Sequence, residues 1–281
     1  MKFDSNLAWK RATSAIAANR EVLLAMAGVF FLLPSLAFSL LFHQGDVEAV
    51  AAPSGDLPPG EALGQVLQQI QTAQGDALPW IIPMAIFQAI GTLAILTLFT
   101  DHSRPTVGQA IRRGLGGVLT YFASQLVLGF GLAIIGAILI GAAMASGSAA
   151  LIALVGIAVV IGAVYAFVKS SLVAPVIAVE GQYSPIAALV RSWRLTRGNS
   201  MRIAVFYLLL IVAFTVITLI VSVILGIVMA LIAGDGAART AEAVVSSIIG
   251  AGLTLYFVAV IAAIHRQLAG PSPDSISETF E

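Results

Sequence analysis

The stretch RIAVFYLLLIVAFTVITLIVSVILGIVMALIA, from Arg202 to Ala233, decides the fold class of this chain, because its only charged residue is the first one. A bilayer core about 30 Å thick is crossed by roughly 20 apolar residues at about 1.5 Å of rise per residue. A helix of this length can cross the bilayer with its backbone hydrogen bonds made within the segment. The stretch therefore predicts a transmembrane helix.

Five further apolar stretches predict helices of the same kind, and two of them are separated only by residues 146–148, which indicates a tight helical hairpin. The composition agrees, because 59% of the residues are hydrophobic and 10% are charged, whereas a soluble domain has about 25% charged residues. We expect an all-α fold, a polytopic membrane helical bundle of about six transmembrane helices. The five stretches are Glu21 to Phe42, Leu78 to Thr100, Leu115 to Ala145, Ala149 to Val179 and Ala241 to Ile264.

The basic residues lie mostly on one side of the six spans, and cytoplasmic segments of membrane proteins carry an excess of Lys and Arg. This distribution predicts that both termini are cytoplasmic, including a tail at residues 271–281. The opposite side holds an extracytoplasmic acidic loop at residues 43–77, within which residues 63–70 predict a short amphipathic helix. The basic side carries Lys2, Lys10, Arg11, Arg20, Arg104, Arg112, Arg113, Arg191, Arg194, Arg197, Arg202 and Arg266, and the loop carries Asp46, Glu48, Asp56, Glu61 and Asp76.

A short polar and basic segment precedes each outgoing span, and each segment predicts a helix that lies in the cytoplasmic interface. The three segments are Asn6 to Arg20, Thr106 to Gly114 and Ser184 to Gly198. Because two spans follow each one, the pattern predicts a threefold repeat of an interfacial helix plus a hairpin. The predicted units cover about residues 1–100, 101–180 and 181–266 of a single integral membrane domain at residues 1–270.

The third of these segments is the clearest, with Ser184 as N-cap, Pro185 at the first helical position and Gly198 as the stop. Apolar residues at helical spacing form a stripe that can enter the headgroup region, and each flanking Arg can gain about 1 kcal/mol from an anionic leaflet. We therefore predict a lipid or partner interface there. Its candidate residues are Arg191, Arg194, Arg197 and Trp193.

Two polar residues near this segment have competing interpretations. Glu180 lies close to Arg191 in the sequence and is predicted to form a structural ion pair with it, while a proton or cation site is the alternative. Lys169 lies about 18 residues into the fourth span, which is about 27 Å at 1.5 Å per residue. We expect its side chain to snorkel to the headgroups at the cytoplasmic rim.

Small residues recur at every fourth position in the third and fourth spans, and such stripes allow close helix packing in membranes. They predict that the two helices of the hairpin touch backbone to backbone, with a homodimer interface as the competing use. The packing residues singled out are Ala137, Gly141, Gly162 and Ala166.

The segment LVAPVIAVEGQYSPIAALVRSWRLTRGN, from Leu172 to Asn199, resembles part of the membrane domain of bacterial glycerophosphoryl diester phosphodiesterases and of related uncharacterised bacterial inner-membrane proteins. The resemblance implies a location in the bacterial inner membrane. In the phosphodiesterases this portion precedes a soluble catalytic domain, and since only about 17 residues follow the last predicted span, we expect that domain to be absent here. The matching positions are Pro175, Glu180, Ala188, Ser192, Leu195, Thr196 and Gly198.

Residues typical of catalysis are sparse. The chain has no cysteine, and its three histidines, His43, His102 and His265, stand alone near predicted membrane edges. No phosphate-binding or nucleophile motif is present, so we expect no cofactor, and a net charge of +0 gives no indication of nucleic acid. We expect a non-catalytic protein that organises membrane lipid, including anionic lipid, or a partner protein. A transporter or channel for a lipid or small solute is the alternative, and a hydrolase or transferase acting on lipid headgroups is the third hypothesis.

Overall fold

The computed structural model describes residues 2–41, 59–100, 105–232 and 235–270, and every regular element in these ranges is a helix. Six segments are long and apolar enough to cross a bilayer, which confirms the predicted all-α class and the number of spans. These six candidate spans are Arg20–Leu40, Pro79–Phe99, Val107–Ala145, Ala149–Glu180, Ser200–Met229 and Thr240–Ala269.

The chain begins with a separate short helix, α1 (Ser5–Ala18), as the sequence predicts for the first interfacial segment. The Asp4 side chain caps α1 by accepting a hydrogen bond from the backbone N–H of Leu7 at 3.1 Å. The first span then divides into α2, a π-helical turn η1 and α3. This π turn lies beside Pro34, which has no N–H for the helical ladder. The bounds are Arg20–Ala27, Gly28–Leu32 and Leu33–Leu41.

The second span is the C-terminal part of a longer helix, α5 (Pro59–Thr100). Residues 59–77 of the predicted acidic loop are therefore helical, and the predicted amphipathic helix at 63–70 is continuous with α5. The rest of that loop, and all five of its acidic side chains, lie outside what the structure describes, as does the tail at residues 271–281.

The expectation of a separate interfacial helix at Thr106–Gly114 is wrong, because this segment forms the first turns of α6 (Val107–Ala145). Thr106 and Gln109 form a capping box that starts the helix. The helix continues through Gly114. This glycine permits a close approach to α5, since a Cβ at this position would lie 2.9 Å from the carbonyl oxygen of Ile90. Separate short helices are therefore found in the first and third predicted units only.

The third and fourth spans form the predicted hairpin, with α6 followed by α7 (Ala149–Ser170). Gly147 takes a left-handed conformation in the turn, with φ of 68°, and Ser148 caps α7. The fourth span is not a single helix, because a turn at Ser171 and Leu172 separates α7 from α8 (Val173–Glu180).

The hairpin does not pack through the stripe predicted for it. A Cβ added to Gly141 or Gly162 would meet no atom within 4 Å, and Ala137 is exposed. The contact instead uses the buried Gly136, where an added Cβ would lie 3.5 Å from Val159. The spacing of small residues is the same on several faces of α6, but packing selects one face. Of the four predicted residues only Ala166 is buried.

The last three helices are α9, α10 and α11, and Gly198 turns the chain between the first two with φ of 80°. The N-terminal segment closes onto this end of the protein, because Phe3 N–H donates to Asn199 Oδ1 at 2.9 Å. Gln267, in the last turn of α11, accepts from Asp4 N–H at 3.1 Å. The bounds of these helices are Pro185–Leu195, Ser200–Ile232 and Asp235–Ala269.

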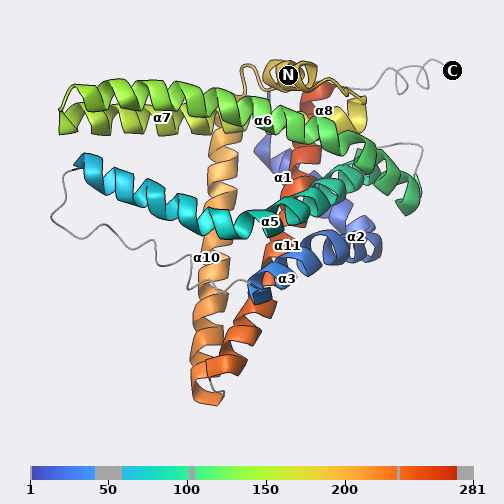
Figure 1. Ribbon diagram of the computed structural model, residues 1–281. Coiled ribbons are helices and arrows are strands. Elements are labelled where there is room, and N and C mark those ends of the chain that lie inside the picture. The colour runs from blue at the N-terminus through green and yellow to red at the C-terminus, as the bar shows by residue number, and fades with distance from the viewer. Residues whose placement is uncertain (1, 42–58, 101–104, 233–234, 271–281) are drawn as a thin grey trace.

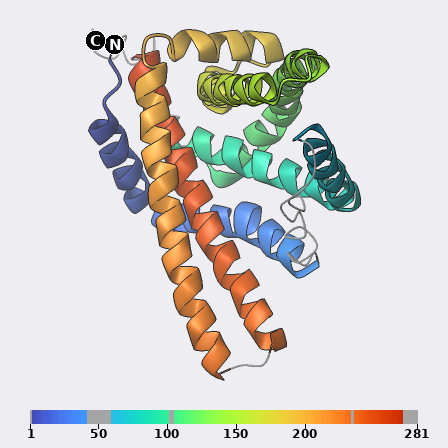
Figure 2. The same ribbon diagram turned by 90° about the vertical axis from the view of Figure 1, so that its left-hand side faces the viewer.

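Two long hairpins project from a shared core in different directions. Figure 1 shows α10 and α11 running crosswise to α6 and α7, and in Figure 2 α6 and α7 are viewed almost along their axes while α10 and α11 stay upright. The core is formed by the inner parts of α5 and α11 with α1, η1 and α8. Large apolar side chains along α6, α7 and α10 are exposed, as expected for surfaces that face lipid.

Candidate functional site

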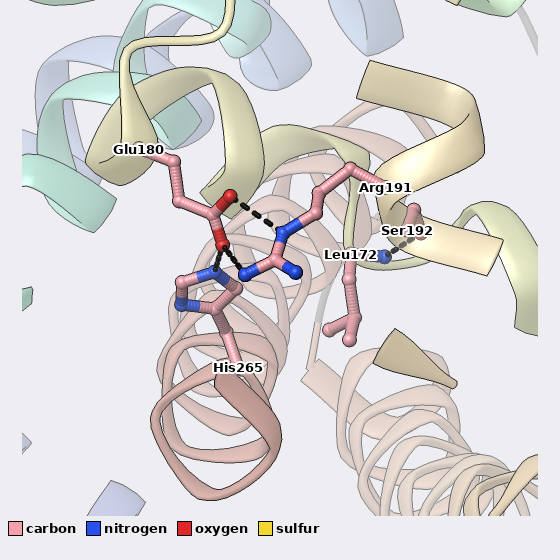
Figure 3. Close-up of polar contacts among 5 residues, drawn as sticks. All are labelled: Leu172, Glu180, Arg191, Ser192 and His265. Carbon is pink, nitrogen blue, oxygen red and sulfur yellow. Dashed lines mark hydrogen bonds and ion pairs between the residues drawn. The ribbon is translucent and has the colours of Figure 1, made fainter. Parts of the chain in front are cut away.

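Glu180 and Arg191, the ion pair expected from the sequence, lie in contact where α8, α9 and α11 meet (Figure 3). Glu180 is the last residue of α8, and Gly181 then reverses the chain with φ of 66°. Arg191 donates through Nε to Glu180 Oε2 at 2.8 Å and through a terminal nitrogen to Oε1 at 3.1 Å. This two-bonded geometry fixes the orientation of α9 relative to α8. The hydrogen bond with Glu180 raises the pKa of Arg191, so its charge persists.

His265 also contacts Glu180, a partner that the sequence interpretation missed. Its Nε2 lies 3.0 Å from Glu180 Oε1, and the residue is only 3% exposed. Because an ionised carboxylate can only accept, Nε2 carries the proton in this contact. The prediction that His265 stands alone is therefore wrong. The sequence signal that could have found it is a histidine in an otherwise apolar part of the last span, where a buried polar group needs a partner.

Both oxygens of Glu180 are occupied by these two side chains, which favours a structural ion pair over an ion-binding carboxylate. Across the described ranges, no group of three or more His, Asp or Glu residues is arranged to hold a metal ion. The site can therefore join three helices and neutralise its own charge.

Ser192 makes a second connection between α9 and the rest of the molecule (Figure 3). Its hydroxyl donates to the carbonyl of Lys169 at 2.6 Å and accepts from the N–H of Leu172 at 3.2 Å. Both partners lie at the break between α7 and α8, where helix ends leave backbone groups unpaired. Ser192 is fully buried and supplies the missing partners.

The other positions of the segment from Leu172 to Asn199 also hold α9 in place. Ala188 is completely buried, and its small side chain lets α9 lie close to the core. Thr196 ends the helix by donating to the carbonyl of Ser192 at 3.0 Å. From α6, Thr120 donates to the carbonyl of Tyr183 at 3.0 Å, just before α9 begins.

Three of the four predicted interface residues lie on the exposed side of this segment, two of them on α9 and Arg197 in the turn that follows it. Trp193, Arg194 and Arg197 are exposed, whereas Arg191 is directed at Glu180. Trp193 packs edge-on against Tyr165 of α7, with ring centroids 6.3 Å apart. The structure therefore separates the residues that fix α9 from those that it presents outward.

Comparison with protein-family models, with curated proteins and with solved structures gives no significant match. The short helix α9 is held by the contacts of Arg191 with Glu180 and of Ser192 with the α7–α8 break, while Trp193 and Arg194 are exposed on it and Arg197 is exposed just after it.

Proposed function

We propose that this chain is a non-catalytic multi-pass protein of the bacterial inner membrane that organises anionic lipid at its cytoplasmic face. The observation that supports this proposal is the fixed position of α9. Glu180 and Ser192 hold its inner side, so that Trp193 and Arg194 are exposed on α9 and Arg197 is exposed in the turn that follows. A rigid helix loses less conformational entropy when a ligand binds.

The exposed residues of α9 have the chemistry of a membrane interface. Tryptophan is enriched at the headgroup level of bilayers, and each Arg near an anionic surface contributes about 1 kcal/mol of attraction. Ile186 and Val190 are also exposed on α9, at 65% and 43%. An apolar stripe beside cationic groups matches a bilayer surface, where acyl chains lie beside phosphates.

More positive charge lies near the same end of the molecule. Lys2 and Arg202, with one acidic residue, Asp4, line one cavity of about 640 Å³ between the N-terminal segment and the start of α10. The hydrogen bond from Phe3 to Asn199 holds the N-terminal segment there. We call the set Lys2, Arg194, Arg197 and Arg202 the basic end.

The proposal is tested by measuring which lipids surround the protein in vesicles of phosphatidylcholine and phosphatidylglycerol at known proportions. The protein is extracted in nanodisc-sized patches with their lipid, and the lipid composition of the patches is compared with that of the vesicles. We expect phosphatidylglycerol to be enriched. Added salt should weaken this enrichment, and replacing all four residues of the basic end by Gln should return the patches to the bulk composition.

A protein that carries the two lipids in their bulk proportions would contradict the proposed function. The same reconstituted protein also tests the alternative of transport. Movement of labelled lipid or solute across vesicles that depends on the protein would favour the transporter hypothesis.

A further inference from the structure

An apolar groove of about 710 Å³ lies between α6, α7 and α9, and Lys169, Arg194 and Arg197 contribute to its wall. Pockets that bind small molecules have volumes of about 300–1,000 Å³. Among the described residues that line this groove none is acidic. A groove with three cationic residues and no acidic one is complementary to an anion.

Lys169 gives the strongest indication that the groove binds a ligand. It lies in the last turn of α7, and the residue is only 6% exposed. Its Nζ lies 5.5 Å from the ring centre of Tyr165, and in the part of the chain that the structure describes it forms no ion pair. Lys169 was expected to snorkel to the headgroups at the cytoplasmic rim, whereas the structure buries it against α9 and Tyr165. A buried ammonium is costly without an anion, and the aromatic ring offsets only part of that cost.

Arg194 and Arg197 add two cations on the α9 side of the groove. Both are exposed, and within the described ranges neither takes part in an ion pair. A guanidinium group binds two oxygens of a phosphate in one plane, which an ammonium group cannot do. Two guanidinium groups and a buried ammonium together suit a phosphate group.

The rest of the groove selects a lipid over a free phosphate. Leu128 and Leu132 of α6 and Ile186 and Val190 of α9 give it an apolar wall that a free phosphate would leave exposed to water. The wall continues along the hairpin, where Ile135 is 58% exposed. Acyl chains could therefore extend from the groove along the hairpin without leaving an apolar surface.

We propose that the groove between α6, α7 and α9 binds one anionic phospholipid, with its phosphate on Lys169, Arg194 and Arg197. The acyl chains lie against Leu128 and Leu132. This inference rests on the proposed function and names one stoichiometric site within it.

The test is native mass spectrometry of the protein after detergent exchange into micelles that contain either phosphatidylglycerol or phosphatidylcholine. We expect one retained phosphatidylglycerol and no comparable retention of phosphatidylcholine. Arg194→Gln combined with Arg197→Gln removes two charged hydrogen-bonding groups, so the affinity should fall at least about tenfold. Lys169→Met removes the ammonium at similar length and should weaken retention in the same direction.

A steric variant tests the groove without changing its charge. Gly131 lines the groove, and an added Cβ there would meet nothing within 4 Å, so Gly131→Phe should fill the groove and displace the lipid. Gly129→Phe is the matched control, because Gly129 is equally open but does not line the groove. Arg112→Gln is the control for charge, since Arg112 is exposed on α6 outside the groove. Helical circular dichroism and size-exclusion elution verify that each variant is folded.

Retention of the lipid by folded Gly131→Phe and by the double Arg variant would overturn the inference. Equal retention of the two lipids by the wild-type protein, or no retained lipid, would overturn it as well. These outcomes are distinct from failure of the proposed function, because enrichment of phosphatidylglycerol around the protein in vesicles does not require a single retained molecule.

Discussion

Glu180 joins side chains from two other helices, and each of the three residues depends on the others. His265 lies among fully or nearly fully buried residues of α11, including Ala263 and Ile264, and Glu180 is the partner that satisfies its Nε2. Arg191 uses two nitrogens on the same carboxylate. Removing one partner from such a group costs more than the net contribution of the pair, because it leaves buried polar atoms unpaired.

We predict that Glu180→Gln lowers the free energy of unfolding by about 1–2 kcal/mol, because it removes the charge that holds Arg191 and His265. Thermal unfolding in detergent measures the effect as a lower melting temperature. Glu21→Gln is the control: it makes the same change at an exposed position of α2, where the expected effect is within about 0.5 kcal/mol. Equal losses in both variants would show that the contacts of Glu180 contribute nothing specific.

The sequence was enough to predict one of the two contacts of Glu180, with Arg191, but not the other, with His265. Arg191 is 11 positions away, and Gly181 and the start of α9 lie between them, so local spacing was enough to predict the pair. His265 is 85 positions away. No local pattern connects residues at that separation, since the contact exists only because α11 packs beside α8 in the folded chain.

At the scale of the elements, glycines allow helices to pack closely. Among the described residues, the most extensive contact between two elements is that of α5 with α6. Gly114 and Gly117 of α6 lie at this contact, where added Cβ atoms would approach the carbonyl oxygen of Ile90 to 2.9 Å and the side chain of Leu93 to 3.1 Å. The sequence interpretation placed the close packing in the α6–α7 hairpin instead. Small residues recur on several faces of these helices, and their spacing does not determine which face is turned toward a neighbour.

We predict that Gly114→Ala lowers the melting temperature, because the new methyl group would collide with backbone that cannot move independently of α5. The matched control is Gly162→Ala, where an added Cβ meets open space. Alanine favours a helix over glycine by up to about 1 kcal/mol, so the control should be neutral or stabilising. Destabilisation by Gly162→Ala, without destabilisation by Gly114→Ala, would contradict this prediction and favour the packing stripe predicted from the sequence.

At the scale of the whole molecule, length and hydropathy were enough to predict six apolar helices. They contain no information about how the helices are oriented relative to one another. The crosswise course of α10 and α11 relative to α6 and α7 (Figure 1) arises from packing at the core. The tilt of a membrane helix is set by its neighbours and not by its apolar length. A flat bilayer has one normal, so this arrangement gives the two hairpins different tilts.

The charge pattern predicts the sidedness of the chain, which cysteine labelling can measure because the protein contains no native cysteine. Ser146→Cys places a thiol at the tip of the α6–α7 hairpin, and Gln182→Cys places one between α8 and α9. We expect a membrane-impermeant maleimide to label the first in intact spheroplasts and the second only after permeabilisation. Labelling of both from the same side would contradict the predicted orientation.

The bonds from Phe3 to Asn199 and from Asp4 to Gln267 have a consequence for biogenesis. Helix α1 packs on α11, and the two are separated by nearly the whole chain. Helix α1 is synthesised before α11 and must therefore wait for it before the contacts between these two helices can form, and closing so long a loop is entropically unfavourable. A nascent chain arrested before α11 would leave Ala8 and Ala12 without their packing partner. Synthesis of α11 is thus a condition for the docking of α1 on it.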